Sequence, residues 1–176
     1  ILDLADLTVD GTMCTGGAVC IMMMLSGQNV FVAMLAATLA GMLTGLVTGI
    51  FHTFMGIPAI LAGILTQLSL YSINLKIMGK ANQAINVDKY NLLVSLRYIK
   101  NVPFLKNTLF VVAICIILLV LLLYWFFGTE VGCALRATGC NGNMSRAQGI
   151  NTNLTKVLGL MLSNGLVGLS GALLSQ

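Results

Sequence analysis

Three aspartates enter an apolar segment at the start of the chain, and their spacing is the first indication of chemistry. Asp3, Asp6 and Asp10 are spaced so that a helix through this stretch would carry all three on one face. Carboxylates are costly within an apolar segment and usually face a protein interior or an aqueous cavity. Two interpretations of Asp10 stay open: it lines a substrate pathway, or it has a structural capping role.

Further polar residues extend this candidate pathway. Thr8 and Thr12 flank Asp10, and the glycines within residues 11–17 weaken a helix there. Broken helices with polar residues near the middle of the membrane are typical of substrate pathways. Asn164 lies in a later apolar segment, where it can hydrogen-bond to a neighbouring helix. The predicted substrate pathway consists of Thr8, Asp10, Thr12 and Asn164.

The remaining residues form no recognisable catalytic or cofactor-binding pattern. No Ser/His/Asp or Cys/His nucleophile arrangement is visible, and the phosphate-binding pattern GxxxxGK[ST] is absent. The nearest approach to it, Gly79-Lys80, is followed by Ala81. We therefore expect no catalytic residue and no ATP site on this chain. The five cysteines form no CxxC pair and have no nearby set of histidines, so we predict inert thiols and no metal.

The composition indicates a membrane protein. Of the 176 residues, 58% are hydrophobic and 8% are charged, and the mean hydropathy is +0.98. Soluble domains carry roughly 25% charged residues, so a soluble protein does not fit. The net charge of +4 is too small and too dispersed to indicate nucleic acid as a partner. Because the chain begins at Ile1 and ends within an apolar run, we expect an internal fragment of a longer protein.

Five apolar segments approach or meet the roughly 20 residues that a membrane-spanning helix needs. They comprise residues 4–25, 30–51, 57–78, 109–127 and 154 to the end. The sequence therefore predicts an all-α fold, a polytopic transmembrane helical bundle with about five membrane segments, the first of them broken. Residues 1–176 are expected to form a single transmembrane domain.

The second segment carries a stripe of small residues that recur every four positions. This small-residue stripe consists of Ala33, Ala37, Gly41, Gly45 and Gly49. Small residues allow close approach of another helix, which drives helix association in lipid. We therefore predict a buried helix–helix contact along the stripe. The segment at 109–127 has no such stripe, and we expect it to face lipid.

A longer polar region, residues 80–107, separates the third and fourth segments. Residues 92–100 within it suit either a short interfacial helix or an ordinary amphipathic loop helix. The region contains five basic residues, and a positive-inside count alone would place it in the cytoplasm.

A polar island, residues 128–153, separates the last two apolar segments. Residues 131–138 predict a short helix that stops at Gly139. Asn141 or Asn143 can cap a second short helix at 144–148, which stops at Gly149. With Arg136 and Arg146 as charged groups, this segment suits docking in a groove of a partner protein. A solvated connecting loop is the alternative, although it would need neither this length nor two capped helices.

The island also carries a recognisable pattern, Gly132-x-Ala134-x-Arg136-Ala137-x-Gly139-x-Asn141 followed by Arg146-Ala147-x-Gly149-Ile150. It resembles the cytoplasmic coupling segment of ABC importer permeases, in the branch with ribose and branched-chain amino-acid permeases. Residues 2–11, 56–66 and 71–82 resemble a narrower subgroup. That subgroup comprises amino-acid uptake permeases of Gram-positive bacteria, with aromatic amino acids as one candidate substrate class.

The resemblance implies a homodimeric or pseudo-dimeric pore in the bacterial cytoplasmic membrane. Its implied partners are an ATPase subunit that holds ATP and magnesium, an external substrate-binding lipoprotein and a second permease copy. It also implies that the island is cytoplasmic and that residues 80–107 are external, against the charge count. The implied ATPase-coupling residues are Gly132, Arg136, Ala137, Gly139, Asn141, Arg146, Ala147 and Gly149. The alternative is a self-contained ion channel or secondary transporter, in which the aspartates bind cations directly.

Overall fold

The computed structural model describes residues 2, 4–80 and 108–176, and every regular element in these ranges is a helix. The predicted all-α fold is therefore confirmed. The predicted break in the first segment is wrong, because one continuous helix runs through Gly11, Gly16 and Gly17, which pack against neighbouring elements. The elements are α1 (Val9–Leu25), α2 (Val30–Thr53), α3 (Ala59–Met78), α4 (Thr108–Gly128), α5 (Glu130–Cys140), α6 (Gly142–Ala147) and α7 (Thr152–Leu174).

The helices α2, α3 and α7 are each long and apolar enough to cross a membrane. A fourth span arises if α4 and α5 count as one broken span, since their axes are bent by 79° at the break. With 17 residues, α1 is shorter than the other apolar helices. At 1.5 Å per residue it extends about 25 Å, somewhat less than a hydrocarbon core of about 30 Å.

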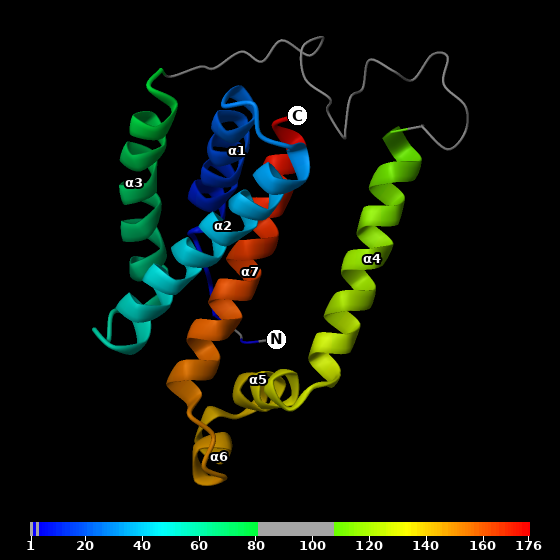
Figure 1. The fold of residues 1–176 in the computed structure, drawn as a ribbon. Helices are drawn as coiled ribbons and strands as arrows, with labels where there is room; N and C mark the ends of the chain where they lie inside the picture. The colour runs from blue at the N-terminus through cyan, green and yellow to red at the C-terminus, as the bar shows by residue number, and fades with distance from the viewer. Residues whose placement is uncertain (1, 3, 81–107) are drawn as a thin grey trace.

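The centre of the bundle is formed by α1, α2 and α7 (Figure 1). Helices α1 and α7 run in the same direction and contact each other, and α2 runs in the opposite direction across both (Figure 1). Glycines bring these backbones together: a Cβ at Gly16 would meet the Gly168 backbone, and one at Gly41 would meet the Asn164 carbonyl. The core therefore consists of close backbone contacts rather than large interlocking side chains.

The small-residue stripe lies entirely inside this core. Ala33 and Ala37 are fully buried, and the three glycines of the stripe are also buried. A Cβ added at Gly45 would meet the Leu160 carbonyl, and one added at Gly49 would lie 3.1 Å from the Val157 Cα. The stripe of α2 is thus a helix–helix contact, chiefly with α7.

Helix α4 stands apart from the centre (Figure 1). Among the described helices, α5 is the only one whose backbone lies close to that of α4. Leu118, Leu121 and Trp125 are among its many exposed side chains. This exposure fits a surface toward lipid. The helix expected within residues 92–100 lies outside the described residues.

Candidate functional site

The segment before α1 is extended, so the prediction of three aspartates on one helical face is wrong. The helix begins at Val9, and Asp10 occupies its first turn. Asp6 precedes the helix, where its Oδ1 accepts a 2.9 Å hydrogen bond from the Thr8 N–H. Aspartate competes for nearby backbone donors in this way, which favours a helix start over a helix interior. Asp3 lies outside the described residues.

Close packing holds this extended segment against α3. A Cβ added at Gly63 would lie 2.9 Å from the backbone nitrogen of Leu7. Glycine at position 63 therefore permits the backbone at Leu7 to approach α3. Because the segment is anchored here, Asp6 is directed toward the bundle and not along a helical face.

Asn164 joins Asp6 to the core of the bundle. Its Nδ2 donates to Asp6 Oδ2 at 2.7 Å and to the Leu160 carbonyl at 3.1 Å. Its Oδ1 accepts a 2.7 Å hydrogen bond from Thr12 Oγ1. Since Asn164 is fully buried, these bonds supply the partners that water cannot.

Two threonines of α2 complete this arrangement. Thr44 Oγ1 lies 3.0 Å from Thr12 Oγ1, and Thr48 Oγ1 lies 3.1 Å from Thr8 Oγ1. The polar network thus links four elements, and its members are Asp6, Thr8, Thr12, Thr44, Thr48 and Asn164. Thr44 and Thr48 are absent from the predicted pathway, although their spacing beside the small-residue stripe was a usable signal.

The structure thus brings together three of the four predicted pathway residues, Thr8, Thr12 and Asn164. All three are fully buried, with partners inside the bundle. Asp10 is exposed and does not join them. Asp6, rather than Asp10, supplies the carboxylate of this region.

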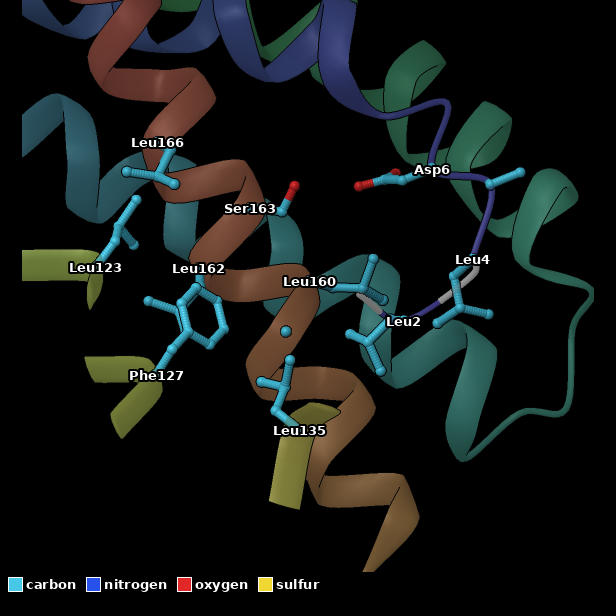
Figure 2. A pocket seen from close by; sticks show the side chains of 12 residues that line it. Leu2, Leu4, Asp6, Leu123, Phe127, Leu135, Leu160, Leu162, Ser163 and Leu166 are labelled. Atoms are coloured by element: carbon cyan, nitrogen blue, oxygen red, sulfur yellow. The ribbon is translucent and has the colours of Figure 1, made fainter. Parts of the chain in front are cut away.

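A cavity of about 660 Å³ opens beside the polar network, between α7, α4, α5 and the segment before α1. Figure 2 shows the Asp6 carboxylate and the Ser163 hydroxyl at one end of it, with leucine and phenylalanine side chains elsewhere. Its lining residues are Leu2, Leu4, Ala5, Asp6, Leu123, Phe127, Leu135, Gly159, Leu160, Leu162, Ser163 and Leu166. Asn164 and Thr12 stand behind Asp6 and orient it.

The second candidate site is the α5–α6 segment, which lies at the end of the bundle opposite the α1–α2 turn (Figure 1). Leu135 and Thr138 of α5 are buried toward α7, and Thr138 Oγ1 lies 3.1 Å from Thr155 Oγ1. The other side is open: Met144 is 60% exposed, and Ala147 is also exposed. The segment is therefore anchored to α7 on one side and exposed on the other.

The turn from α4 into α5 depends on Gly132 and Arg136. A Cβ at Gly132 would lie 2.5 Å from the Phe127 Cα, so only glycine fits this corner without a shift. Arg136 Nη2 donates a 2.7 Å hydrogen bond to the Phe127 carbonyl at the end of α4. A cation at this position also complements the helix dipole. Arg146 Nη2 donates to Thr152 Oγ1 at 3.1 Å, so both arginines have an acceptor within the chain.

The predicted ends of these two helices are partly right. Asn141 caps α6, since its Oδ1 accepts from the N–H groups of Asn143 and Met144 at 3.1 Å. Gly149 has a φ of 83°, the left-handed conformation expected after a helix. Gly139 does not end α5, however, because the helix continues through Cys140 to a C-cap at Asn141. Ala137 lies partly buried on α5 and Ala147 ends α6.

These features define a multi-pass helical membrane protein with two short helices, α5 and α6, at one end of its bundle. The chain belongs to the family of branched-chain amino acid transport system permease components, whose match covers residues 1–176.

Two curated relatives are similar to this chain, and the first of them carries a permease name. A tyrosine transport system permease protein of Clostridioides difficile (strain R20291) is 40% identical over 178 residues, covering 100% of this chain and 56% of the relative. An uncharacterized protein of Rickettsia prowazekii (strain Madrid E) is 35% identical over 178 residues, covering 100% of this chain and 59% of the relative. The chain therefore spans somewhat over half the length of these relatives. No solved structure matches it.

Proposed function

We propose that this chain is the membrane-spanning part of an ABC importer that moves an amino acid across the bacterial cytoplasmic membrane. The free energy that drives this transport comes from ATP hydrolysis on a separate ATPase subunit, which holds ATP and magnesium. An extracytoplasmic lipoprotein delivers the substrate, and a second permease copy completes the pore. The family match and the tyrosine transport relative support this proposal, and they make tyrosine the first substrate to test.

The observation that carries the proposal is the construction of the α5–α6 segment. Two short helices with side-chain caps are anchored to α7, and their outer side presents Met144 and Ala147. A push on this side reaches α4 through the bond between Arg136 and Phe127, and α7 through the contact between Thr138 and Thr155. The segment can therefore pass movement of a docked protein into two helices of the bundle.

This function fixes the orientation of the chain in the membrane. The α5–α6 segment faces the cytoplasm, and the opposite end of the bundle, with the α1–α2 turn, faces outward (Figure 1). The polar region at 80–107, expected on the outer side, lies outside the described residues except for Lys80. Gly132 and Gly149 shape the α5–α6 segment, and Asn141 caps α6. Ala137 and Gly139 are proposed as further positions of the surface that meets the ATPase. Arg136 and Arg146 stabilise its corners and present their remaining N–H groups to acidic groups on the ATPase.

The experiment that tests this function places a cysteine at Ala147 in a full-length permease without its native cysteines, since Cys133 and Cys140 of α5 are themselves exposed. The membranes also contain the ATPase subunit. We expect a disulfide or a short bifunctional crosslink to form with a cysteine on the ATPase. Gln28→Cys, in the α1–α2 turn at the opposite end of the bundle, is the matched control and should form none (Figure 1). Labelling of Ala147→Cys from outside the cell, or crosslinking only at position 28, would overturn the proposal.

A further inference from the structure

The cavity beside α7 combines one carboxylate with walls that are otherwise nearly all apolar. Among its twelve lining residues Asp6 is acidic, Ser163 carries a hydroxyl, and none is basic. Its volume of about 660 Å³ falls within the usual range of sites for small organic molecules. Cavities of that kind are lined by apolar side chains and a few placed polar groups, as this one is.

The Asp6 carboxylate is held in place and still has acceptor capacity. Its Oδ1 accepts from the Thr8 N–H at 2.9 Å, and its Oδ2 accepts from Asn164 Nδ2 at 2.7 Å. A carboxylate offers about four lone-pair sites, so roughly two remain for a further donor. Asn164 cannot turn away, because its other amide hydrogen and its Oδ1 are bonded to Leu160 and Thr12.

The Asp6 carboxylate has two donors within the chain but no basic partner among the residues that line the cavity. A cation as counter-charge would stabilise an anion beside apolar walls further. The lining residues that the structure describes supply no such cation. The apolar walls, which include Phe127, Leu160 and Leu166, suit an aliphatic or aromatic group attached to that cation.

We propose that this cavity binds an apolar organic amine, with its ammonium group at Asp6 and Ser163 and its apolar group against Phe127, Leu160 and Leu166. This inference rests on the proposed function, and it assigns the place in the bundle where an imported amino acid with an apolar or aromatic side chain would bind. The ammonium and the side chain of such an amino acid are the parts that the lining recognises. A simple arylalkylamine without a carboxylate should therefore also bind.

The first test measures the preference of the cavity for positive charge. The full-length permease in membrane vesicles carries Ser163→Cys in a background without its native cysteines. Thiol labelling rates are compared for a trimethylammonium-ethyl and a sulfonato-ethyl methanethiosulfonate, each normalised to its rate with a free thiol. We expect the cationic reagent to react about tenfold faster, as for a site that concentrates counter-ions.

Removing the carboxylate should abolish that preference. With Asp6→Asn added, the two normalised rates should become equal, whereas with Asp10→Asn they should keep their ratio, since Asp10 does not line the cavity. Equal rates with Asp6 intact would overturn the proposal. A preference that survives Asp6→Asn would overturn it as well.

The second test uses ligand protection and needs no additional substitution. We expect 2-phenylethylamine to slow labelling of Ser163→Cys by the neutral reagent N-ethylmaleimide, and 3-phenylpropionate to leave the rate unchanged. Equal protection by both compounds would mean an apolar cavity for lipid or for another segment of the protein, and would overturn the proposal. These readouts require neither ATPase nor transport, so they stand or fall separately from the importer assignment.

Discussion

Asn164 Nδ2 donates a 2.7 Å hydrogen bond to Asp6 Oδ2 and so joins α7 to the segment that precedes α1, 158 residues apart in the sequence. The same side chain accepts from Thr12 on α1, and Thr12 in turn contacts Thr44 on α2. One amide therefore connects the three central helices to the carboxylate of the cavity. Its loss should affect both the stability of the bundle and the position of Asp6.

Replacing Asn164 with alanine should lower the stability of the permease by about 1–3 kcal/mol, because buried polar groups of Thr12 and the Asp6 carboxylate lose their partner. The fully buried thiol of Cys20 offers a probe, since it reacts with a thiol-specific dye only on unfolding. Thermal unfolding is followed in a variant with Cys20 as its sole cysteine. Ser170→Ala, an exposed change on the same helix, is the control, and an equal melting temperature for both would contradict the assigned role of Asn164.

Gly41→Ala should destabilise the bundle by about 1–3 kcal/mol, the typical cost of overpacking a core. The added Cβ would meet the Asn164 carbonyl and would lie 3.2 Å from the Gly165 Cα, so backbone and not a flexible side chain obstructs it. Gly142→Ala is the matched control, because a Cβ there has no neighbour within 4 Å. Thermal unfolding of the two variants in detergent checks the difference. Equal melting temperatures for the Gly41→Ala and Gly142→Ala variants would refute the close contact of α2 with α7.

Gly132→Ala should impair coupling between the ATPase and the bundle, because its Cβ would force the α4–α5 corner apart at Phe127. We expect ATP hydrolysis by the assembled complex to continue while uptake falls about tenfold or more, a change equivalent to at least about 1.4 kcal/mol. Gly128→Ala at the same corner has open space for its Cβ and should transport normally. Normal uptake in both variants would show that the corner geometry does not matter for coupling.

Asn141→Ala should loosen α6 by about 1 kcal/mol, the usual cost of losing an N-cap. The side chain caps the N–H groups of Asn143 and Met144, so amide hydrogen exchange should accelerate at Met144 and the residues that follow. Asn143→Ala removes a neighbouring amide that does not serve as the cap, and it should leave exchange nearly unchanged. Similar acceleration in both variants would contradict the capping role of Asn141.

Local signals in the sequence were sufficient for much of this fold. The apolar segments predicted α2, α3 and α7 closely, because length and hydropathy dominate helix formation in a membrane. The register of small residues predicted which face of α2 is buried. Gly149 and a pair of candidate caps, Asn141 or Asn143, were identified because caps and left-handed glycines depend on only a few neighbouring residues. The structure selects Asn141.

The parts of the site that were not predicted depend on contacts between segments far apart in the sequence. Helical spacing placed Asp6 and Asp10 on one face, but Asp6 instead bonds to the Thr8 N–H and to Asn164, far away in the sequence. Thr44 and Thr48 donate to carbonyl groups within α2, and only their further contacts with Thr12 and Thr8 depend on the register of α2 against α1. Gly139 looked like a helix end, yet α5 continues past it to Asn141.

ATP-dependent uptake of labelled tyrosine into proteoliposomes tests the central assignment most directly. The full-length permease is reconstituted with its ATPase subunit and its substrate-binding lipoprotein, with ATP supplied on the side of the α5–α6 segment. We expect uptake only with ATP and all three components, and none by the permease alone. Uptake or ion flux through the permease without the ATPase would contradict this account and favour a self-contained channel or secondary transporter.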